Sequence, residues 1–157
     1  MKYKHTQIGY LMIFVMLVVM AFFVWLYTVA ALEPESVDSG SNFVITAVMV
    51  LVLGILGSFV SLSVMIDEKY LQVKFGFGIF QKKFLLQDIQ SVKSVRNHWY
   101  YGWGIKWWWN PKMWIYSVSG LDAVEIVLNN GKIYRIGTDE PKELEYALSM
   151  SVNSNIP

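Results

Sequence analysis

The sequence predicts a small integral membrane protein in which two hydrophobic helices anchor a compact, mostly β domain on the cytoplasmic face. Two observations carry this prediction: two long runs without any charged residue, and a strand-like alternation that follows them. Of the 157 residues, 55% are hydrophobic and 16% are charged, whereas a soluble domain usually carries about 25% charged residues. The shortage of charge is concentrated in the first part of the chain.

The two charge-free runs are long enough to cross a bilayer as helices. They cover Ile8–Leu32 and Phe43–Ile66, 25 and 24 residues, and about 20 apolar residues span the roughly 30 Å of hydrocarbon. Neither run has the polar stripe of a buried soluble helix. We therefore expect a transmembrane hairpin in residues 1–66, with spans at about 8–32 and 43–66 and an external loop at 33–42, followed by a second domain in residues 67–157.

The charges that flank the runs predict that both termini are cytoplasmic. Short loops rich in Lys and Arg stay on the cytoplasmic side of a membrane. Lys2 and Lys4 precede the first run, Lys69 and Lys74 follow the second, and the loop 33–42 carries three acids and no base. The predicted location is the plasma membrane, crossed twice.

A cleaved signal peptide is the alternative interpretation of the first run, because Val29-Ala30-Ala31 resembles a small-residue cleavage site. The apolar region of a signal peptide is typically about 7–15 residues long. This run is much longer, which favours a membrane span.

From Asp67 onward the sequence has the period of strands and turns. Tyr70–Phe75 alternates polar and apolar residues, as half-buried strands do. Asn129-Asn130-Gly131 between two apolar runs is the strongest hairpin signal in the chain. Further strands are expected at Ile79–Leu86, Ile89–Val95, Ala123–Leu128 and Lys132–Ile136.

The last element is predicted to be a helix. Thr138 or Asp139 can cap it, Pro141 fits its first turn, and an apolar stripe contains Leu144 and Leu148. Several antiparallel strands closed by one C-terminal helix predict a roll or a partly open barrel with one end plugged by that helix.

Five segments of the second part, taken together, carry a resemblance to a known family. They are Phe75-Gly76-Phe77-Gly78, Leu86-Gln87-Asp88-Ile89, Tyr100-Tyr101-Gly102-Trp103-Gly104, Ser119-Gly120-Leu121-Asp122-Ala123-Val124-Glu125 and Arg135-Ile136-Gly137-Thr138-Asp139-Glu140-Pro141. With them, the chain from about Asp67 to Val152 resembles the pleckstrin-homology-like (PH-like) domains of small, membrane-anchored bacterial proteins with two N-terminal transmembrane helices. The resemblance implies a fold and membrane association. It implies no enzymatic activity and no particular ligand.

The residues give little support for catalysis or for a metal site. The chain has no Cys, and its two His, at positions 5 and 98, form no His-x-x-x-His or Glu-x-x-His pair. No Gly-x-Ser-x-Gly elbow is present. We therefore expect a non-enzymatic protein with no catalytic residue, no cofactor and no metal, and keep an undetected enzyme as the least favoured alternative.

An aromatic and basic segment is the best candidate for a binding surface. Six of the seven Trp lie between Trp99 and Trp114, and the stretch from Lys69 to Lys112 holds eight bases and one acid. Each base near an anionic leaflet contributes about 1 kcal/mol, and Trp suits the headgroup zone. Trp is also enriched in protein-binding hot spots, so a lipid surface and a protein partner are both open. The candidate residues are Arg96, Lys106, Trp107, Trp108, Trp109 and Lys112, whereas Trp99 and Trp103 are assigned to the core.

Small residues in the second run form a candidate helix-packing face. Gly54, Gly57, Ser58 and Ser61 make two pairs spaced i,i+4, which lets helices approach closely. Packing against the first span of the same chain is the simpler interpretation, and a homodimer seam is the alternative. Neither run contains an ionisable residue of the kind that a proton or ion pathway needs.

The sequence thus predicts a membrane-anchored module that binds a protein partner or anionic lipid headgroups at the cytoplasmic face. The alternative is an accessory subunit of a larger membrane complex that uses its transmembrane helices as the binding surface. Nucleic acid is not expected as a partner, because the domain is tethered to the membrane.

Overall fold

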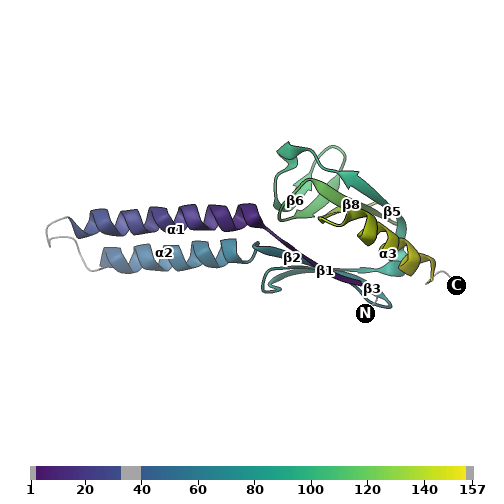
Figure 1. The fold of residues 1–157 in the computed structure, drawn as a ribbon, viewed down its shortest axis with the longest axis horizontal. Helices are drawn as coiled ribbons and strands as arrows, with labels where there is room; N and C mark the ends of the chain where they lie inside the picture. The colour runs from purple at the N-terminus through teal and green to yellow at the C-terminus, as the bar shows by residue number, and fades with distance from the viewer. Residues whose placement is uncertain (1–2, 33–39, 155–157) are drawn as a thin grey trace.

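The chain folds into an elongated molecule, with a helical hairpin at one end and a β domain at the other (Figure 1). The computed structural model describes residues 3–32 and 40–154. Two sheets and a C-terminal helix form the β domain. The prediction of a mostly β domain with a C-terminal helix is therefore confirmed.

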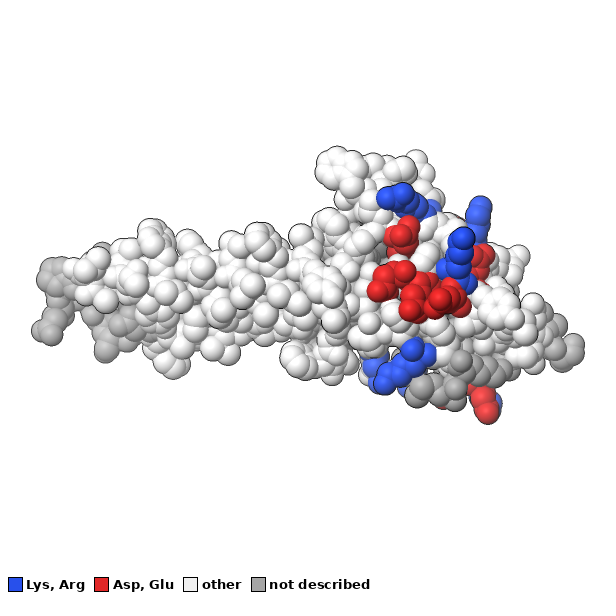
Figure 2. All heavy atoms as spheres, in the orientation of Figure 1, with Lys and Arg blue, Asp and Glu red and all other residues white. Residues whose placement is uncertain are grey.

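The helical hairpin consists of α1 (Tyr10–Ala31) and α2 (Gly40–Gly57). Among the described residues, α1 alone is long and apolar enough to cross a membrane, and its 22 residues extend about 33 Å. Phe23 is the one buried residue of α1, so its other apolar side chains lie wholly or partly at the protein surface. The hydroxyl groups of Tyr27 and Thr46 form a hydrogen bond across the hairpin. Figure 2 shows no charged side chain on the visible face of the described residues of α1 and α2.

The first sheet, sheet A, contains β1 (Tyr3–Ile8), β2 (Ser61–Ile66), β3 (Tyr70–Phe75) and β4 (Phe80–Leu85), all antiparallel, in the order β1-β2-β3-β4. β1 leads directly into α1, and β2 follows α2 after a short connection. Where strands and helices meet, the Gly9 N–H donates to the Val60 carbonyl over 2.6 Å. The helical hairpin is thus a continuation of the β1–β2 pair.

The predicted extent of the second span, 43–66, is wrong. α2 ends at Gly57, and Ser61–Ile66 forms β2, in which every second side chain is buried. The span was predicted too long because the charge-free run continues to Ile66. Within that run, the serines of Ser61–Ile66 alternate with apolar residues, which is the period of a strand. The β structure therefore begins at Tyr3 and not at Asp67.

The second sheet, sheet B, contains β5 (Ile89–Arg96), β6 (Gly104–Trp108), β7 (Met113–Ser117), β8 (Asp122–Leu128) and β9 (Ile133–Gly137), in the order β5-β8-β9-β7-β6. β7 and β9 are parallel, and the other neighbours are antiparallel. Two short 3-10 helices, η1 (Leu86–Asp88) and η2 (Trp99–Tyr101), precede β5 and β6. The hairpin predicted at Asn129-Asn130-Gly131 is confirmed, because this turn joins β8 to β9 and Gly131 donates its N–H to the Leu128 carbonyl over 2.8 Å.

The C-terminal helix, α3 (Pro141–Asn153), covers the core between the two sheets. Leu144 and Leu148 are 0% exposed, as the apolar stripe predicted. The start of the helix differs from the prediction: Glu140 is the N-cap and no side chain caps the first turn. Instead, the Thr138 hydroxyl accepts the Glu140 N–H over 3.1 Å, so Thr138 stabilises the turn that leads into the helix.

Candidate functional site

Three exposed Trp side chains lie on the hairpin formed by β6 and β7, here called the aromatic hairpin (residues 104–117). β6 is an edge strand of sheet B, and Trp107 on it is the direct cross-strand partner of Trp114. The ring of Trp109, in the turn, lies 5.4 Å from that of Trp107, and Trp109 is 73% exposed. Residues directly opposite each other on neighbouring strands point to the same face of the sheet, so Trp107 and Trp114 share one face of the aromatic hairpin.

Trp108 points to the other face of the aromatic hairpin and belongs to a small core. It packs against the cluster of Tyr101, Met113 and Ile115, with its ring 4.6 Å from that of Tyr101. Its indole N–H donates to the Asn110 carbonyl over 3.1 Å, which ties the strand to the turn. Of the three consecutive Trp, the outer two are therefore available for binding and the middle one is structural.

The assignment of Trp99 to the core is wrong, since its side chain is 76% exposed. Trp99 begins the short helix η2, and Tyr101 occupies the buried position of that turn. Trp103 is partly buried, and its indole N–H donates to the Gly120 carbonyl over 3.2 Å.

The candidate basic residues do not form one cluster. Lys106 and Lys112 are exposed on the aromatic hairpin. Lys106 alternates with Trp107 and lies on the opposite face, close to Gly102: a Cβ placed on Gly102 would be 2.5 Å from the Lys106 Nζ. Arg96 ends β5, at the other edge of sheet B, opposite Asp122. The structure thus places two of the three candidate bases on the aromatic hairpin, with Lys106 on the face opposite Trp107 and Trp114, and it separates Arg96 from the hairpin.

The aromatic hairpin lies on the side of the β domain that faces the helical hairpin (Figure 1). The chain after β7 is fixed beside the start of α1, where the Ser119 hydroxyl donates to the Ile8 carbonyl over 3.0 Å and the Gln7 side-chain amide donates to the Ser119 carbonyl over 3.2 Å. A Cβ on Gly9 would lie 3.2 Å from that of Val118. These contacts fix the position of the aromatic hairpin relative to the start of α1.

The predicted helix-packing residues separate into different environments. Gly54 is exposed, and a Cβ added to it would meet no atom within 4 Å, so it does not contact α1. A Cβ added to Gly57 would lie 3.6 Å from the ring of Phe77. Ser58 follows the helix, and its hydroxyl donates back to the Gly54 carbonyl over 3.0 Å, whereas Ser61 begins β2.

Two exposed apolar residues at the β3–β4 turn were missed by the sequence reasoning. Phe77 is 83% exposed and Ile79 is 69% exposed. In the sequence, Phe75-Gly76-Phe77-Gly78 counted as one of the segments that carry the family resemblance. An aromatic residue between two glycines was the available signal, because the glycines turn the chain and leave the side chain at the tip.

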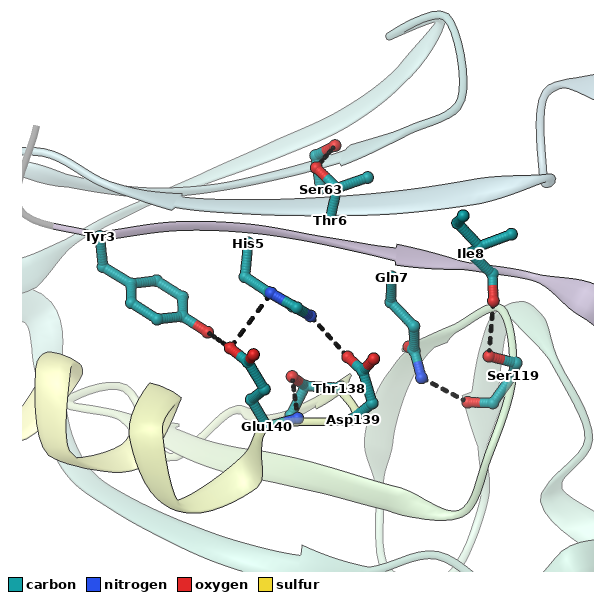
Figure 3. Close-up of polar contacts among 10 residues, drawn as sticks. All are labelled: Tyr3, His5, Thr6, Gln7, Ile8, Ser63, Ser119, Thr138, Asp139 and Glu140. Carbon is teal, nitrogen blue, oxygen red and sulfur yellow. Dashed lines mark hydrogen bonds and ion pairs between the residues drawn. The ribbon is translucent and has the colours of Figure 1, made fainter.

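A polar cluster joins β1 to the segment that begins α3 (Figure 3). The His5 Nε2 lies 2.5 Å from Asp139 Oδ1, its Nδ1 lies 3.1 Å from Glu140 Oε2, and the Tyr3 hydroxyl donates to Glu140 over 3.3 Å. Burial and the neighbouring Glu140 carboxylate raise the pKa of Tyr3. Among the described residues no group of three or more His, Asp or Glu is arranged to hold a metal ion. The polar groups of this cluster pair with one another, and these contacts connect two parts of the chain that are far apart in the sequence.

No family model, curated protein or solved structure matches this chain.

Proposed function

We propose that this protein is a non-enzymatic, membrane-anchored PH-like module whose β domain binds anionic lipid headgroups at the cytoplasmic face through the aromatic hairpin. In this proposal α1 spans the plasma membrane, and α2, a shorter apolar helix packed against α1 in the helical hairpin, returns through it, so both termini are cytoplasmic. The β domain then lies against the inner leaflet, because β1 leads directly into α1 and only a short connection separates α2 from β2.

The observation that carries the proposal is the exposure of Trp107, Trp109 and Trp114 on the aromatic hairpin, whose strand β6 lies on the side of the β domain toward the helical hairpin (Figure 1). A contiguous apolar surface of this kind is unfavourable in water and marks an interaction site. Amphipathic indole rings favour the headgroup region of a bilayer. Lys112, in the turn of the same hairpin, adds attraction to anionic lipid, about 1 kcal/mol near the surface.

The orientation can be tested directly, because the chain contains no Cys. In intact cells, a single cysteine at Ser39, which lies outside the described residues, should react with a membrane-impermeant maleimide. One at Asn153, the last residue of α3, should react only after the membrane is opened. Labelling of Asn153→Cys in sealed cells contradicts the proposed orientation.

Contact between the aromatic hairpin and lipid can be measured with an environment-sensitive fluorophore on the same Cys-free chain. A cysteine at Asn110, in the turn beside Trp109, is compared with one at Asn130, in the β8–β9 turn. In nanodiscs that contain phosphatidylglycerol we expect a blue-shifted emission at position 110 only, lost when Trp107 and Trp109 are replaced by Ser. Equal emission at the two positions contradicts lipid binding, and loss of a co-purifying protein in the Ser variant then favours a protein partner.

A second candidate function is an accessory subunit that binds a larger membrane complex through its helices. The observation in its favour is Gly54, whose surface is exposed and meets no atom of α1. Small residues on a free helix face permit the close approach of another helix. Replacing Gly54 with Leu should release such a partner, or separate a homodimer, and should leave the fluorescence at position 110 unchanged.

A further inference from the structure

A basic groove of ≈370 Å³ lies on the outer face of sheet A, beside the β3–β4 turn. Lys4, Ser63, Lys74 and Gln81 line it together with the turn Gly76–Gly78. Ser63 and Lys74 alternate along their strands with buried core residues, and Gln81 is the cross-strand partner of Lys74, so these side chains face away from sheet B. Figure 2 shows basic side chains along the lower margin of the β domain, where β1–β3 lie in Figure 1.

The register of the sheet places the donors of the groove side by side. Lys74 is the cross-strand partner of Ser63 on β2 and of Gln81 on β4. The Gln81 side-chain oxygen accepts from Gln72 over 3.0 Å, which leaves the amide nitrogen to donate. Two ammonium groups with an amide and a hydroxyl, and no carboxylate in the lining, have the chemistry that binds phosphate.

The groove borders the exposed apolar tip of the β3–β4 turn. Phe77 lines the groove, and its ring lies beside Gly57, the last residue of α2. The exposed side chains of Phe77 and Ile79 are therefore at the level where the chain leaves the helical hairpin. The basic side chains of the groove match the anionic headgroup of a phospholipid, and the apolar side chains of Phe77 and Ile79 match its acyl chains.

We infer that this groove binds the phosphate headgroup of an anionic phospholipid in the leaflet next to the β domain. Lys4 and Lys74 bind the phosphate, and Phe77 and Ile79 contact the upper part of the acyl chains. The inference rests on the proposed membrane anchoring. It does not depend on the aromatic hairpin, which lies on the other sheet.

The test uses the full chain in detergent, titrated with phosphatidylglycerol and followed by native mass spectrometry. We expect Lys4→Gln and Lys74→Gln each to weaken phosphatidylglycerol binding about fivefold, the loss that corresponds to one base at an anionic surface. Lys93→Gln is the control, because Lys93 is an exposed lysine of the β domain that lies on β5 opposite Glu125, away from the groove. Phosphatidylcholine should bind weakly to all four proteins.

Two further arms identify the ligand and the site. Phe77→Ser should weaken phosphatidylglycerol binding, and glycerol phosphate without acyl chains should fail to compete at concentrations equal to those of the lipid. Effective competition by glycerol phosphate, or equal losses in the Lys93 and Lys74 variants, overturns the inference. The Ser variant of Trp107 and Trp109 removes lipid contact at the aromatic hairpin, so Lys74→Gln is repeated in that background. A further fivefold loss assigns the lipid to the groove, and no further loss overturns the inference.

Discussion

The imidazole of His5 lies against two consecutive carboxylates, with its Nε2 2.5 Å from Asp139 Oδ1 and its Nδ1 3.1 Å from Glu140 Oε2. His5 is on β1, before the helical hairpin, and Asp139 follows it by 134 positions. β1 is an edge strand whose ladder is formed with β2 alone. The side-chain contact therefore adds a second attachment for the strand that leads into α1.

Replacing His5 with Ala should destabilise the β domain. His5 is 22% exposed, so its hydrogen bonds are partly shielded from water and their loss should cost about 1 kcal/mol. For a chain of this size we expect a melting temperature lower by about 2–4 °C, measured in detergent. Thr6→Ala is the control, because Thr6 is the next residue, is exposed, and its hydroxyl forms a hydrogen bond with Ser63 within sheet A. Equal shifts in the two variants would show that the contact with α3 adds nothing.

A high-pH limit of stability is expected from Tyr116. Burial, with a smaller contribution from Tyr134, raises the pKa of Tyr116 to about 12, above the value near 10 of an unfolded tyrosine. The folded state keeps this proton after the unfolded chain loses it, so the contribution is complete below about pH 10 and is lost as the pH rises toward 12. We expect stability to fall between pH 9 and 11 by on the order of 1 kcal/mol more in the native chain than in Tyr116→Phe.

The control for this prediction is Tyr146→Phe, since Tyr146 is 69% exposed on α3. Its pH dependence should follow that of the native chain. If the stability of Tyr116→Phe and that of the native chain fall by the same amount between pH 9 and 11, the buried phenol of Tyr116 does not set the high-pH limit of stability.

Local signals in the sequence predicted the strands of the β domain that alternate clearly. β3 was predicted with its observed bounds, and β4, β5, β8, β9 and α3 within a few residues. The strand β2 was not predicted because its apolar residues continue a charge-free run, and lack of charge suits a helical span and a buried strand equally. Its alternating serines contained the missing information.

Long-range pairing could not be predicted in the same way. The parallel contact between β7 and β9, and the attachment of β1 to sheet A, depend on which surfaces the rest of the fold leaves open. The Trp residues show the consequence: a shift of one position moves a side chain to the other face of a strand. Composition singled out the aromatic segment, but only the register separates exposed Trp107 from Trp108, which packs in the small core.

A close approach of two strands requires a glycine at position 137. A Cβ there would lie 2.6 Å from Ser117 Oγ and 3.0 Å from its Cα, and Ser117 is buried. Gly137→Ala should therefore force the end of β9 away from β7 and lower the free energy of unfolding by about 1–3 kcal/mol. Gly54→Ala, where an added Cβ meets no atom within 4 Å, should be harmless. A native-like melting temperature for Gly137→Ala contradicts the predicted clash.

Trp108 and Trp109 are neighbours with opposite roles, and alanine substitutions should separate stability from lipid contact. Trp108 packs on Tyr101 and Met113, so Trp108→Ala should lower the free energy of unfolding by about 2 kcal/mol. Trp109 is largely exposed, and Trp109→Ala should change stability by less than about 0.5 kcal/mol.

The binding measurement should give the reverse order. With the fluorophore at position 110, Trp109→Ala should remove most of the blue shift on phosphatidylglycerol nanodiscs, because the exposed ring that enters the headgroup layer is gone. Trp108→Ala, measured at a temperature where it remains folded, should keep the shift, since Trp107 and Trp109 remain in place. If Trp109→Ala destabilises the protein as much as Trp108→Ala does, the turn is part of the small core and the aromatic hairpin is not a binding surface.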